Sequence, residues 1–331
     1  MRYFITGGAG FIGSHLAHRL IAEGHIVSIL DDLSTGEIAN VETLIPHENF
    51  THRIGCVRND KELVAEMVDR ADMTIHLAAA VGVRLIVERP VHCIETNIGG
   101  TETVLTAAAR KEKPVLIAST SEVYGKSSKI PFTEGDDLVM GSTENSRWAY
   151  ACSKALDEWL ALAYGVEKGV PVIVTRFFNT VGPRQTGRYG MVLPNFARQA
   201  VRGEPITVYG TGDQSRCFGH VQDAVEAVVR LVAKPEAFGN VYNVGTDQEV
   251  TINQLAEKVK ETAGSNSEIV RIPYEKAYPP GFEDMMRRKP SVKKLHDLTG
   301  FRPMTSLDQI VKDVVADQQR ILDEETAGAA R

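Results

Sequence analysis

Tyr150 and Lys154 are the residues of this sequence whose types and spacing point most directly to chemistry. A tyrosine that takes a proton from a hydroxyl near neutral pH needs a pKa well below its ordinary value of about 10, and a nearby lysine supplies the positive charge that lowers it. The four-residue spacing places both side chains on one face of a helix. The same pattern also occurs on surface helices as two solvated neighbours, so it needs support from elsewhere in the sequence.

A glycine-rich turn near the N-terminus gives that support. The apolar strand expected at Arg2–Thr6 is followed by Gly7, Gly10 and Gly13, and then by a helical pattern over residues 14–22. In such a turn the first glycine permits the sharp bend, the second lets the backbone approach a pyrophosphate, and the third allows the helix to pack closely on the strand. The free N–H groups at the helix start then receive the phosphate charge. The motif therefore predicts a dinucleotide site.

An acidic pair after the next expected strand, residues 26–30, indicates which dinucleotide binds. Asp31 and Asp32 stand where a carboxylate is expected to meet the hydroxyl groups of the adenosine ribose. A carboxylate there repels a 2′-phosphate, which favours NAD over NADP. Asp32 can equally be a turn residue.

Composition and charge fit an enzyme that handles small molecules. The chain has 331 residues, of which 43% are hydrophobic and 24% charged, and its net charge of −6 gives no general attraction to nucleic acid or to an anionic membrane. The four cysteines form no CxxC pair and no HExxH motif occurs, so we expect free thiols and no metal site. No apolar run is long enough to span a bilayer, and we expect a cytoplasmic protein.

Strand and helix patterns alternate over the first half of the sequence, which predicts a parallel sheet wrapped by helices. The alternating segments are residues 50–57, 61–68, 73–77, 90–110, 115–118, 148–164 and 172–176. Beyond Asn179 the pattern breaks into shorter pieces separated by glycine and proline, as expected for a second, loop-rich lobe.

Ordered motifs over nearly the whole length resemble those of extended short-chain dehydrogenases/reductases that act on nucleotide sugars, the NAD-dependent epimerase/dehydratase family. The resemblance is carried by residues 7–13, Asp31, residues 76–79, 96–97, 100–101, 119–125, 150–154, 176–179, 182–184, 193–196 and 216–223. It implies an α/β fold: a Rossmann-like, doubly wound parallel sheet with a smaller C-terminal substrate-binding lobe. The expected domains are residues 1–178 for NAD and mainly 179–331 for the nucleotide sugar, with segments that can interleave.

The resemblance also implies roles for individual residues. Thr120 would bond the sugar O4, Tyr150 would be the base, and Lys154 would hold the nicotinamide ribose. The cofactor would be contacted by Gly7, Gly10, Phe11, Ile12, Gly13, Asp31, Asp32, Val57, Leu77, Ala78, Ala79, Asn97, Tyr150 and Lys154. Relatives usually place an aspartate after the third strand to contact adenine, but this chain has Cys56 there, which leaves the backbone of Val57 for that contact.

The substrate side is predicted in the same way. Two arginines suit a pyrophosphate because the guanidinium fork matches paired oxygens. The substrate-binding residues implied are Arg84, Thr120, Asn179, Leu193, Arg216 and Arg288. Arg84 is a candidate clamp for a carboxylate, or else a solvated loop arginine, and Arg288 can meet either phosphate or carboxylate.

Three reactions can follow oxidation of the sugar at C4: epimerisation, loss of water across C5 and C6, or loss of a C6 carboxylate as carbon dioxide. Glu122 resembles the residue that both dehydratases and UDP-glucuronate decarboxylases have at this position, whereas 4-epimerases usually have a small or uncharged one. The runs at residues 145–154 and 287–291 resemble the decarboxylases. We therefore expect decarboxylation of UDP-glucuronate to UDP-xylose or a UDP-4-keto-pentose, with a 4-epimerase second and a 4,6-dehydratase third. A non-catalytic NAD-binding regulatory protein is a further alternative, against which Thr120, Tyr150 and Lys154 argue.

Two finer expectations concern Glu122 and assembly. Glu122 is expected to act on C5 as the fourth catalytic residue, with a pKa raised by a neighbouring substrate acid so that it can donate a proton; alternatively it only pairs with a nearby cation. The helices expected near residues 94–110 and 149–164 carry apolar residues on more than one face. Relatives pair through two such helices from each subunit, so a homodimer is expected.

Overall fold

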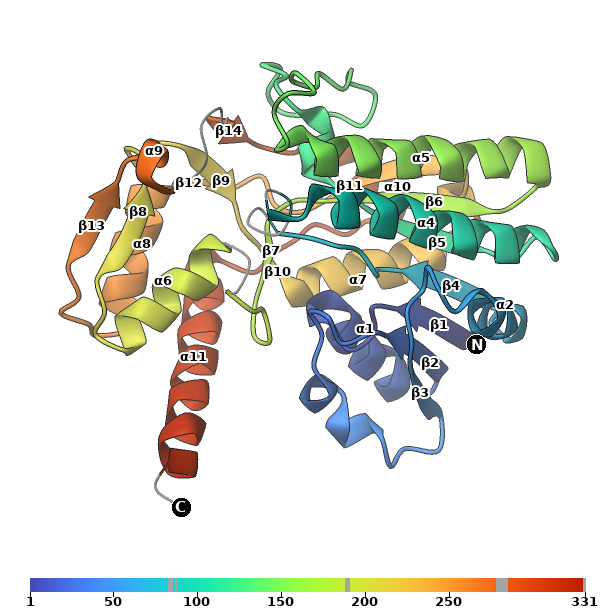
Figure 1. Ribbon diagram of the computed structural model, residues 1–331, viewed down its shortest axis with the longest axis horizontal. Helices are drawn as coiled ribbons and strands as arrows, with labels where there is room; N and C mark the ends of the chain where they lie inside the picture. The colour runs from blue at the N-terminus through green and yellow to red at the C-terminus, as the bar shows by residue number, and fades with distance from the viewer. Residues whose placement is uncertain (83–85, 87, 188–190, 278–284, 330–331) are drawn as a thin grey trace.

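The computed structural model describes residues 1–82, 86, 88–187, 191–277 and 285–329. Figure 1 shows two lobes, a larger one around a central sheet and a smaller one that contains the C-terminal helix.

The larger lobe is built on a seven-stranded sheet in which every neighbouring pair is parallel. Apolar runs such as Tyr3 to Ile5 are buried, as expected of strands with helices on both faces. The strand order is β11-β6-β5-β4-β1-β2-β3. The bounds are β1 Arg2–Thr6, β2 Ile26–Asp31, β3 Phe50–Ile54, β4 Met73–His76, β5 Val115–Thr120, β6 Val172–Phe177 and β11 Asn240–Val244.

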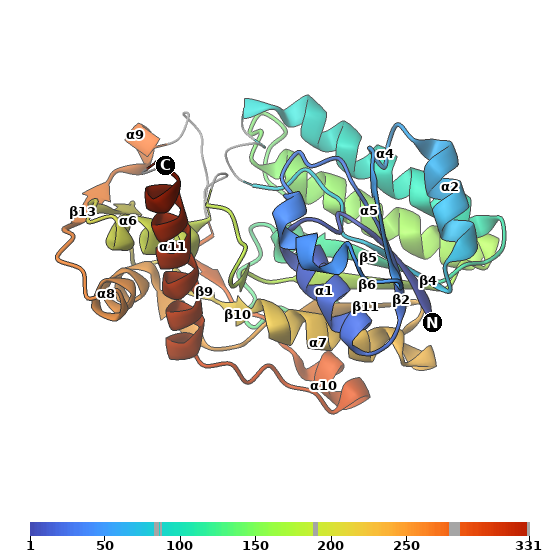
Figure 2. The ribbon, with the colours of Figure 1, turned by 90° about the horizontal axis from the view of Figure 1, so that it is seen from below.

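Helices cover both faces of this sheet (Figures 1 and 2). One face packs against α2 (Lys61–Arg70), α4 (Pro90–Ala109) and α5 (Trp148–Lys168). The other packs against α1 (Phe11–Ala22), α7 (Val221–Val232) and α10 (Lys293–Thr299). Helix α5 ends at Gly169, whose φ of 69° is the left-handed conformation that glycine adopts at helix ends.

The smaller lobe has its own apolar core between helices and short strands. Its helices are α6 (Val192–Val201), α8 (Ile252–Thr262), α9 (Tyr274–Ala277) and α11 (Leu307–Ala329). Its strands form three small sheets: β7 (Thr180–Val181) with β10 (Gly219–His220), β8 (Ile206–Tyr209) with β13 (Ile269–Ile272), and β9 (Ser215–Cys217) between β12 (Glu249–Thr251) and β14 (Arg287–Arg288). Single 3-10 turns lie at Ile38–Asn40, Glu42–Leu44, Ser121–Tyr124 and Pro235–Ala237.

The predicted α/β fold with a parallel sheet is confirmed, and one local detail differs. The strand expected over residues 50–57 ends at Ile54, because the next residues turn and the Cys56 N–H donates to the Asp60 carboxylate at 2.7 Å. The chain also returns from the smaller lobe, so that α7 and β11 lie with the larger one. The division at residue 178 stays a prediction, and the sheet takes its edge strand from beyond it.

Candidate active site

The glycine turn has the close contacts that its motif predicts. Gly7 has a φ of 70°, and a Cβ atom there would lie 2.8 Å from the backbone nitrogen of Ala78. A Cβ on Gly13 would lie 2.1 Å from the carbonyl oxygen of Gly7. Helix α1 begins after Gly10 without a side-chain cap, so the amides of Phe11 and Ile12 at its first turn are available to an anion. This cradle fits the pyrophosphate of a dinucleotide.

Asp31 ties the glycine turn to the end of β2. One of its carboxylate oxygens accepts from the Ala9 N–H and the other from the Leu33 N–H, both at 2.9 Å. Burial raises the pKa of Asp31, although these backbone bonds oppose the rise. Asp32 is exposed and accepts from Ser34, as a turn residue would. Asp31 is therefore the better placed of the two to meet a ribose at this strand end.

Asn97 links the loop after β4, residues 77–80, to helix α5. Its Oδ1 accepts from the Ala80 N–H at 2.8 Å, and its Nδ2 donates to Ser153 Oγ at 3.1 Å. The side chain is fully buried, so these bonds support the site from behind. The loop residues Leu77, Ala78 and Ala79 are partly exposed at the carboxyl end of β4, and Val57 is buried beside Gly100. Their contacts with a cofactor stay predictions.

Thr120 and Tyr150 meet where β5 ends. Thr120 is the last residue of β5, and its hydroxyl accepts from the Glu122 N–H at 3.2 Å. Burial raises the pKa of Tyr150 above its ordinary value and the charge of Glu122 raises it further, while a hydrogen bond with Thr120 lowers it. Lys154, on the same buried helix face, donates to Asp157 Oδ2 at 2.6 Å. The lowering of the Tyr150 pKa expected from Lys154 is therefore not found, because burial and the charge of Glu122 outweigh it.

Glu122 lies in a cluster of arginines. Arg147 Nη1 donates to Glu122 Oε2, and Arg288 Nη2 lies 3.4 Å from Glu122 Oε1. Burial opposes ionisation, but the charges of Arg147, Arg288 and Arg216 outweigh it and lower the pKa of Glu122 to about 2. The expectation of a raised pKa is therefore wrong for this structure, and the alternative of pairing with a cation is what the structure shows. At neutral pH Glu122 is an anion.

Arg216 and Arg288 come together through strand pairing. Strands β9 and β14 run parallel with Arg288 in register with Arg216, and both side chains are buried. Asn179 Nδ2 donates to the Cys217 carbonyl at 3.3 Å, next to Arg216. Leu193 is fully buried in the core of the smaller lobe, so its side chain does not face a ligand. Arg84 lies outside the described residues.

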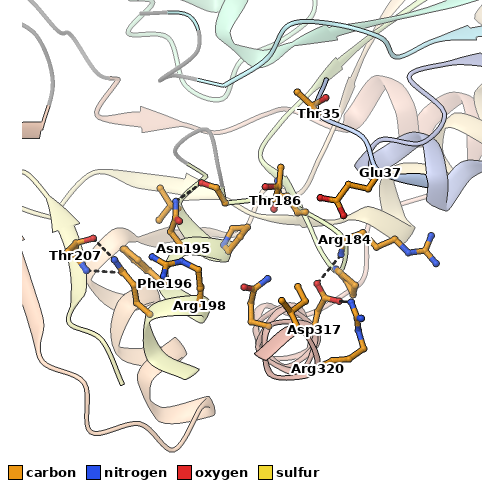
Figure 3. Close-up of a pocket in the computed structure, with 18 of the residues that line it drawn as sticks. Thr35, Glu37, Arg184, Thr186, Asn195, Phe196, Arg198, Thr207, Asp317 and Arg320 are labelled. Carbon is orange, nitrogen blue, oxygen red and sulfur yellow. Dashed lines mark hydrogen bonds and ion pairs between the residues drawn. The ribbon is translucent and has the colours of Figure 1, made fainter. Parts of the chain in front are cut away.

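A cavity of about 1270 Å³ opens between the lobes (Figure 3). Thr35 and Glu37 from the larger lobe line one side, and Asn195 and Phe196 from α6 line the other. Arg216 is part of the lining, whereas Thr120 and Tyr150 are not among its described residues. The cavity therefore reaches Arg216 but, in the described part of the chain, not Thr120 or Tyr150.

Sequence reasoning missed Arg147 and Asp157. Arg147 stands just before α5, in a run that already resembled decarboxylases, but nothing in the sequence distinguishes a buried arginine from a solvated one. Asp157 follows Lys154 by three residues, a spacing that places both on one helix face and could have indicated the ion pair.

The described part of the chain shows neither a cluster of metal ligands nor a membrane-spanning helix. No group of three histidine, cysteine or acidic residues gathers there as a metal site would require. Of the helices described, none is long and apolar enough to cross a membrane.

Comparisons with known proteins agree with this geometry. Residues 3–245 match the model of the NAD dependent epimerase/dehydratase family. The chain is 42% identical over 318 residues to a UDP-N-acetyl-alpha-D-glucosaminuronate decarboxylase of Bacillus cytotoxicus, covering 95% of this chain and 96% of that protein. It is 37% identical over 311 residues to UDP-glucuronic acid decarboxylase 1 of Xenopus tropicalis, covering 93% and 70%.

Solved structures of similar proteins match this fold over nearly the whole chain. A UDP-glucose 4-epimerase of Thermotoga maritima, solved with UDP-glucose, superposes with a TM-score of 0.87 at 29% identity and covers 97% of this chain and 100% of that one. Pal from Bacillus thuringiensis has the same TM-score and coverage at 28% identity. The family match covers most of the chain and coincides with its glycine turn and its Tyr150–Lys154 helix, so the chain belongs to the NAD dependent epimerase/dehydratase family.

Proposed function

We propose that this protein is an NAD-dependent decarboxylase of a UDP-linked uronic acid, with UDP-glucuronate as the first candidate and UDP-xylose or a UDP-4-keto-pentose as the product. The observation that carries the proposal is the arginine cluster beside Thr120 and Tyr150. Three guanidinium groups, those of Arg147, Arg288 and Arg216, act on the carboxylate of Glu122. Guanidinium groups gathered at one place suit a substrate that brings both a diphosphate and a carboxylate.

The proposed reaction begins at C4. NAD, when bound on the glycine turn, supplies the hydride acceptor and later returns the hydride. Tyr150 would take the proton of the C4 hydroxyl once the positive charge of bound NAD offsets the burial and the Glu122 charge that raise its pKa, and Thr120 would hold the oxygen in place. Once C4 is a ketone, the C6 acid is a β-keto acid: the C5–C6 bond breaks, carbon dioxide leaves, and the electron pair moves onto the C4 oxygen. The Tyr150 and Thr120 hydroxyls then stabilise that enolate oxygen until C5 takes up a proton from water. Return of the hydride to C4 would give UDP-xylose, whereas release before that step would give the UDP-4-keto-pentose and leave the cofactor reduced.

In this proposal Glu122 is not a proton donor. With a pKa of about 2 it stays ionised, and its two oxygens hold Arg147 and Arg288 in fixed positions. We propose that the oriented arginines bind the C6 carboxylate and that Arg216, with Asn179, binds the diphosphate next to the cavity between the lobes. The nucleotide would then occupy that cavity.

Two other substrates or reactions have a specific observation in their favour. The Bacillus cytotoxicus relative is named for a substrate with an N-acetyl group, so UDP-N-acetylglucosaminuronate is the second candidate for the same reaction. A 4-epimerase is favoured by the Thermotoga structure. A 4,6-dehydratase needs a base and an acid at C5 and C6, and the two arginine contacts make Glu122 a weak base.

We further propose a homodimer formed by α4 and α5. These helices pack side by side (Figure 1), and their outer face exposes large apolar residues. Trp159 is 61% exposed and Val166 is 89% exposed, and Leu156 and Ile94 are also exposed. A second copy would cover this face and brace the helix that carries Tyr150. We also propose a cytoplasmic location, a reducing compartment that keeps the four free cysteines as thiols.

The test of the function is incubation of the purified protein with NAD and each of three substrates: UDP-glucuronate, UDP-N-acetylglucosaminuronate and UDP-glucose. Release of carbon dioxide from one of the acids, with a shortened sugar, supports the proposal. An epimerised acid or UDP-galactose without carbon dioxide would identify an epimerase instead.

A further inference from the structure

Asn243 joins three segments of the chain near the reaction centre. It lies in β11 and is fully buried. Its Oδ1 accepts from the Tyr124 hydroxyl at 2.7 Å, and its Nδ2 donates to the carbonyl oxygens of Phe132 at 3.0 Å and Ser291 at 3.2 Å. The side-chain amide therefore uses its oxygen and both of its N–H groups, each on a different segment.

Two of these segments carry the side chains that meet in the arginine cluster. Tyr124 ends the short 3-10 turn that contains Glu122, and Ser291 follows Arg288 by three residues. The Glu122 and Arg288 side chains are the pair that lies 3.4 Å apart. Asn243 thus bridges the backbone supports of the carboxylate and of the guanidinium.

Phe132 strengthens the bridge. Its N–H donates to the Lys289 carbonyl at 2.8 Å, and its carbonyl accepts from the Ser291 N–H at 2.7 Å. Its ring stacks on that of Tyr124, with centroids 4.5 Å apart and planes 10° from parallel. Strand β14 itself is only two residues long, so the bonds to Phe132 and Asn243 are needed to hold the residues that follow it against the larger lobe.

We propose that Asn243 is a positioning residue that sets the place of Arg288 relative to Glu122, and through it the fit of the sugar's carboxylate. This inference rests on the proposed function. Asn243 lies far from the glycine turn that is expected to hold the cofactor. Its strand β11 is at the edge of the sheet, with three strands between it and β1, and the glycine turn follows β1. A change at Asn243 should therefore affect sugar binding and leave NAD binding intact.

Asn243→Asp is the sharpest change. It keeps the size and the oxygen that faces Tyr124, but it replaces the two N–H donors with an oxygen that repels the carbonyls of Phe132 and Ser291. The matched control is Asn240→Asp, on the same strand but partly exposed, where the amide bonds to Glu236, Phe238 and Lys294. If Asn243→Asp fails to fold, Tyr124→Phe removes the hydroxyl that donates to Asn243 and that also contacts Arg176.

The experiment measures binding to variants made on a Tyr150→Phe background, which prevents turnover. Calorimetry gives the affinities for UDP-glucuronate, UDP and NAD, and hydrogen exchange follows the amides of Phe132 and Ser291. We expect Asn243→Asp to weaken UDP-glucuronate binding by about tenfold or more, with UDP and NAD affinities nearly unchanged and faster exchange at both amides. We expect Tyr124→Phe to act in the same direction with a smaller factor, and Asn240→Asp to change none of these.

Two results would overturn the inference: unchanged affinity for UDP-glucuronate, or an equal loss of affinity for all three ligands, which would show a general structural role. If the parent variant binds neither UDP-glucuronate nor UDP, the proposed function fails instead. In that case unchanged exchange at Phe132 and Ser291 still refutes the bridge, and faster exchange supports it.

Discussion

Replacing Glu122 with glutamine tests whether the buried carboxylate is an ionised partner of the arginines. Its pKa falls from an ordinary value of 4.5 to about 2. At about 1.36 kcal/mol for each pKa unit, the folded protein favours the ionised form by roughly 3 kcal/mol, which is the size expected for breaking a buried ion pair. Glu122→Gln should therefore lower the free energy of unfolding at pH 7 by roughly that amount.

The contribution of Glu122 to the free energy of unfolding should depend on pH. Because the pKa of Glu122 is lower in the folded protein, its contribution is fully present above about pH 5 and is lost as the pH falls toward about 2. The stability gap between the native protein and Glu122→Gln should shrink to less than half by about pH 3. Urea unfolding followed by circular dichroism at several pH values measures this. The control is Glu167→Gln, an exposed position on α5, which should show no such gap.

Turnover should change as well. Without the carboxylate, Arg147 and Arg288 lose the group that holds them, so we expect the misplaced substrate carboxylate in Glu122→Gln to slow decarboxylation by a factor on the order of 10² while NAD affinity is kept. A gap in stability that is the same at pH 3 and pH 7 would refute the ionised pair. Full activity with an epimerised product would refute the assigned chemistry.

Tyr150→Phe should abolish turnover and leave NAD binding nearly intact, because only the proton acceptor is deleted; loss of NAD binding by calorimetry would show a structural role. The protein should bind NAD far better than NADP, because the Asp31 carboxylate at the end of β2 repels a 2′-phosphate. Tighter binding of NADP than of NAD in a calorimetric titration would contradict this. Light scattering at micromolar concentration should show a dimer that Trp159→Glu dissociates, and a monomeric native protein would exclude the proposed interface.

The sequence predicted the parts of the molecule that depend on local pattern. The glycine turn, the strand before it and the helix with Tyr150 and Lys154 follow from short-range rules, since a turn that excludes Cβ atoms and an i, i+4 spacing can be read directly. The alternation of apolar segments likewise indicated the parallel sheet.

The electrostatics of the site depended on tertiary contacts that no spacing reveals. Arg147 and Arg288 come from segments 141 positions apart, and their convergence on Glu122 reverses the expected direction of its pKa. The same holds for β11, which enters the sheet from beyond residue 178 and brings Asn243 to the site. Long-range pairing, and not helix or strand propensity, decides these features.

The most direct test of the central claim uses UDP-glucuronate labelled with carbon-13 at C6 and followed by NMR in the presence of NAD. The account predicts that the labelled carbon appears as carbon dioxide or bicarbonate, that the remaining sugar is a UDP-pentose or its 4-keto form, and that Tyr150→Phe shows neither. Retention of the label in the sugar, with inversion at C4, would contradict the account.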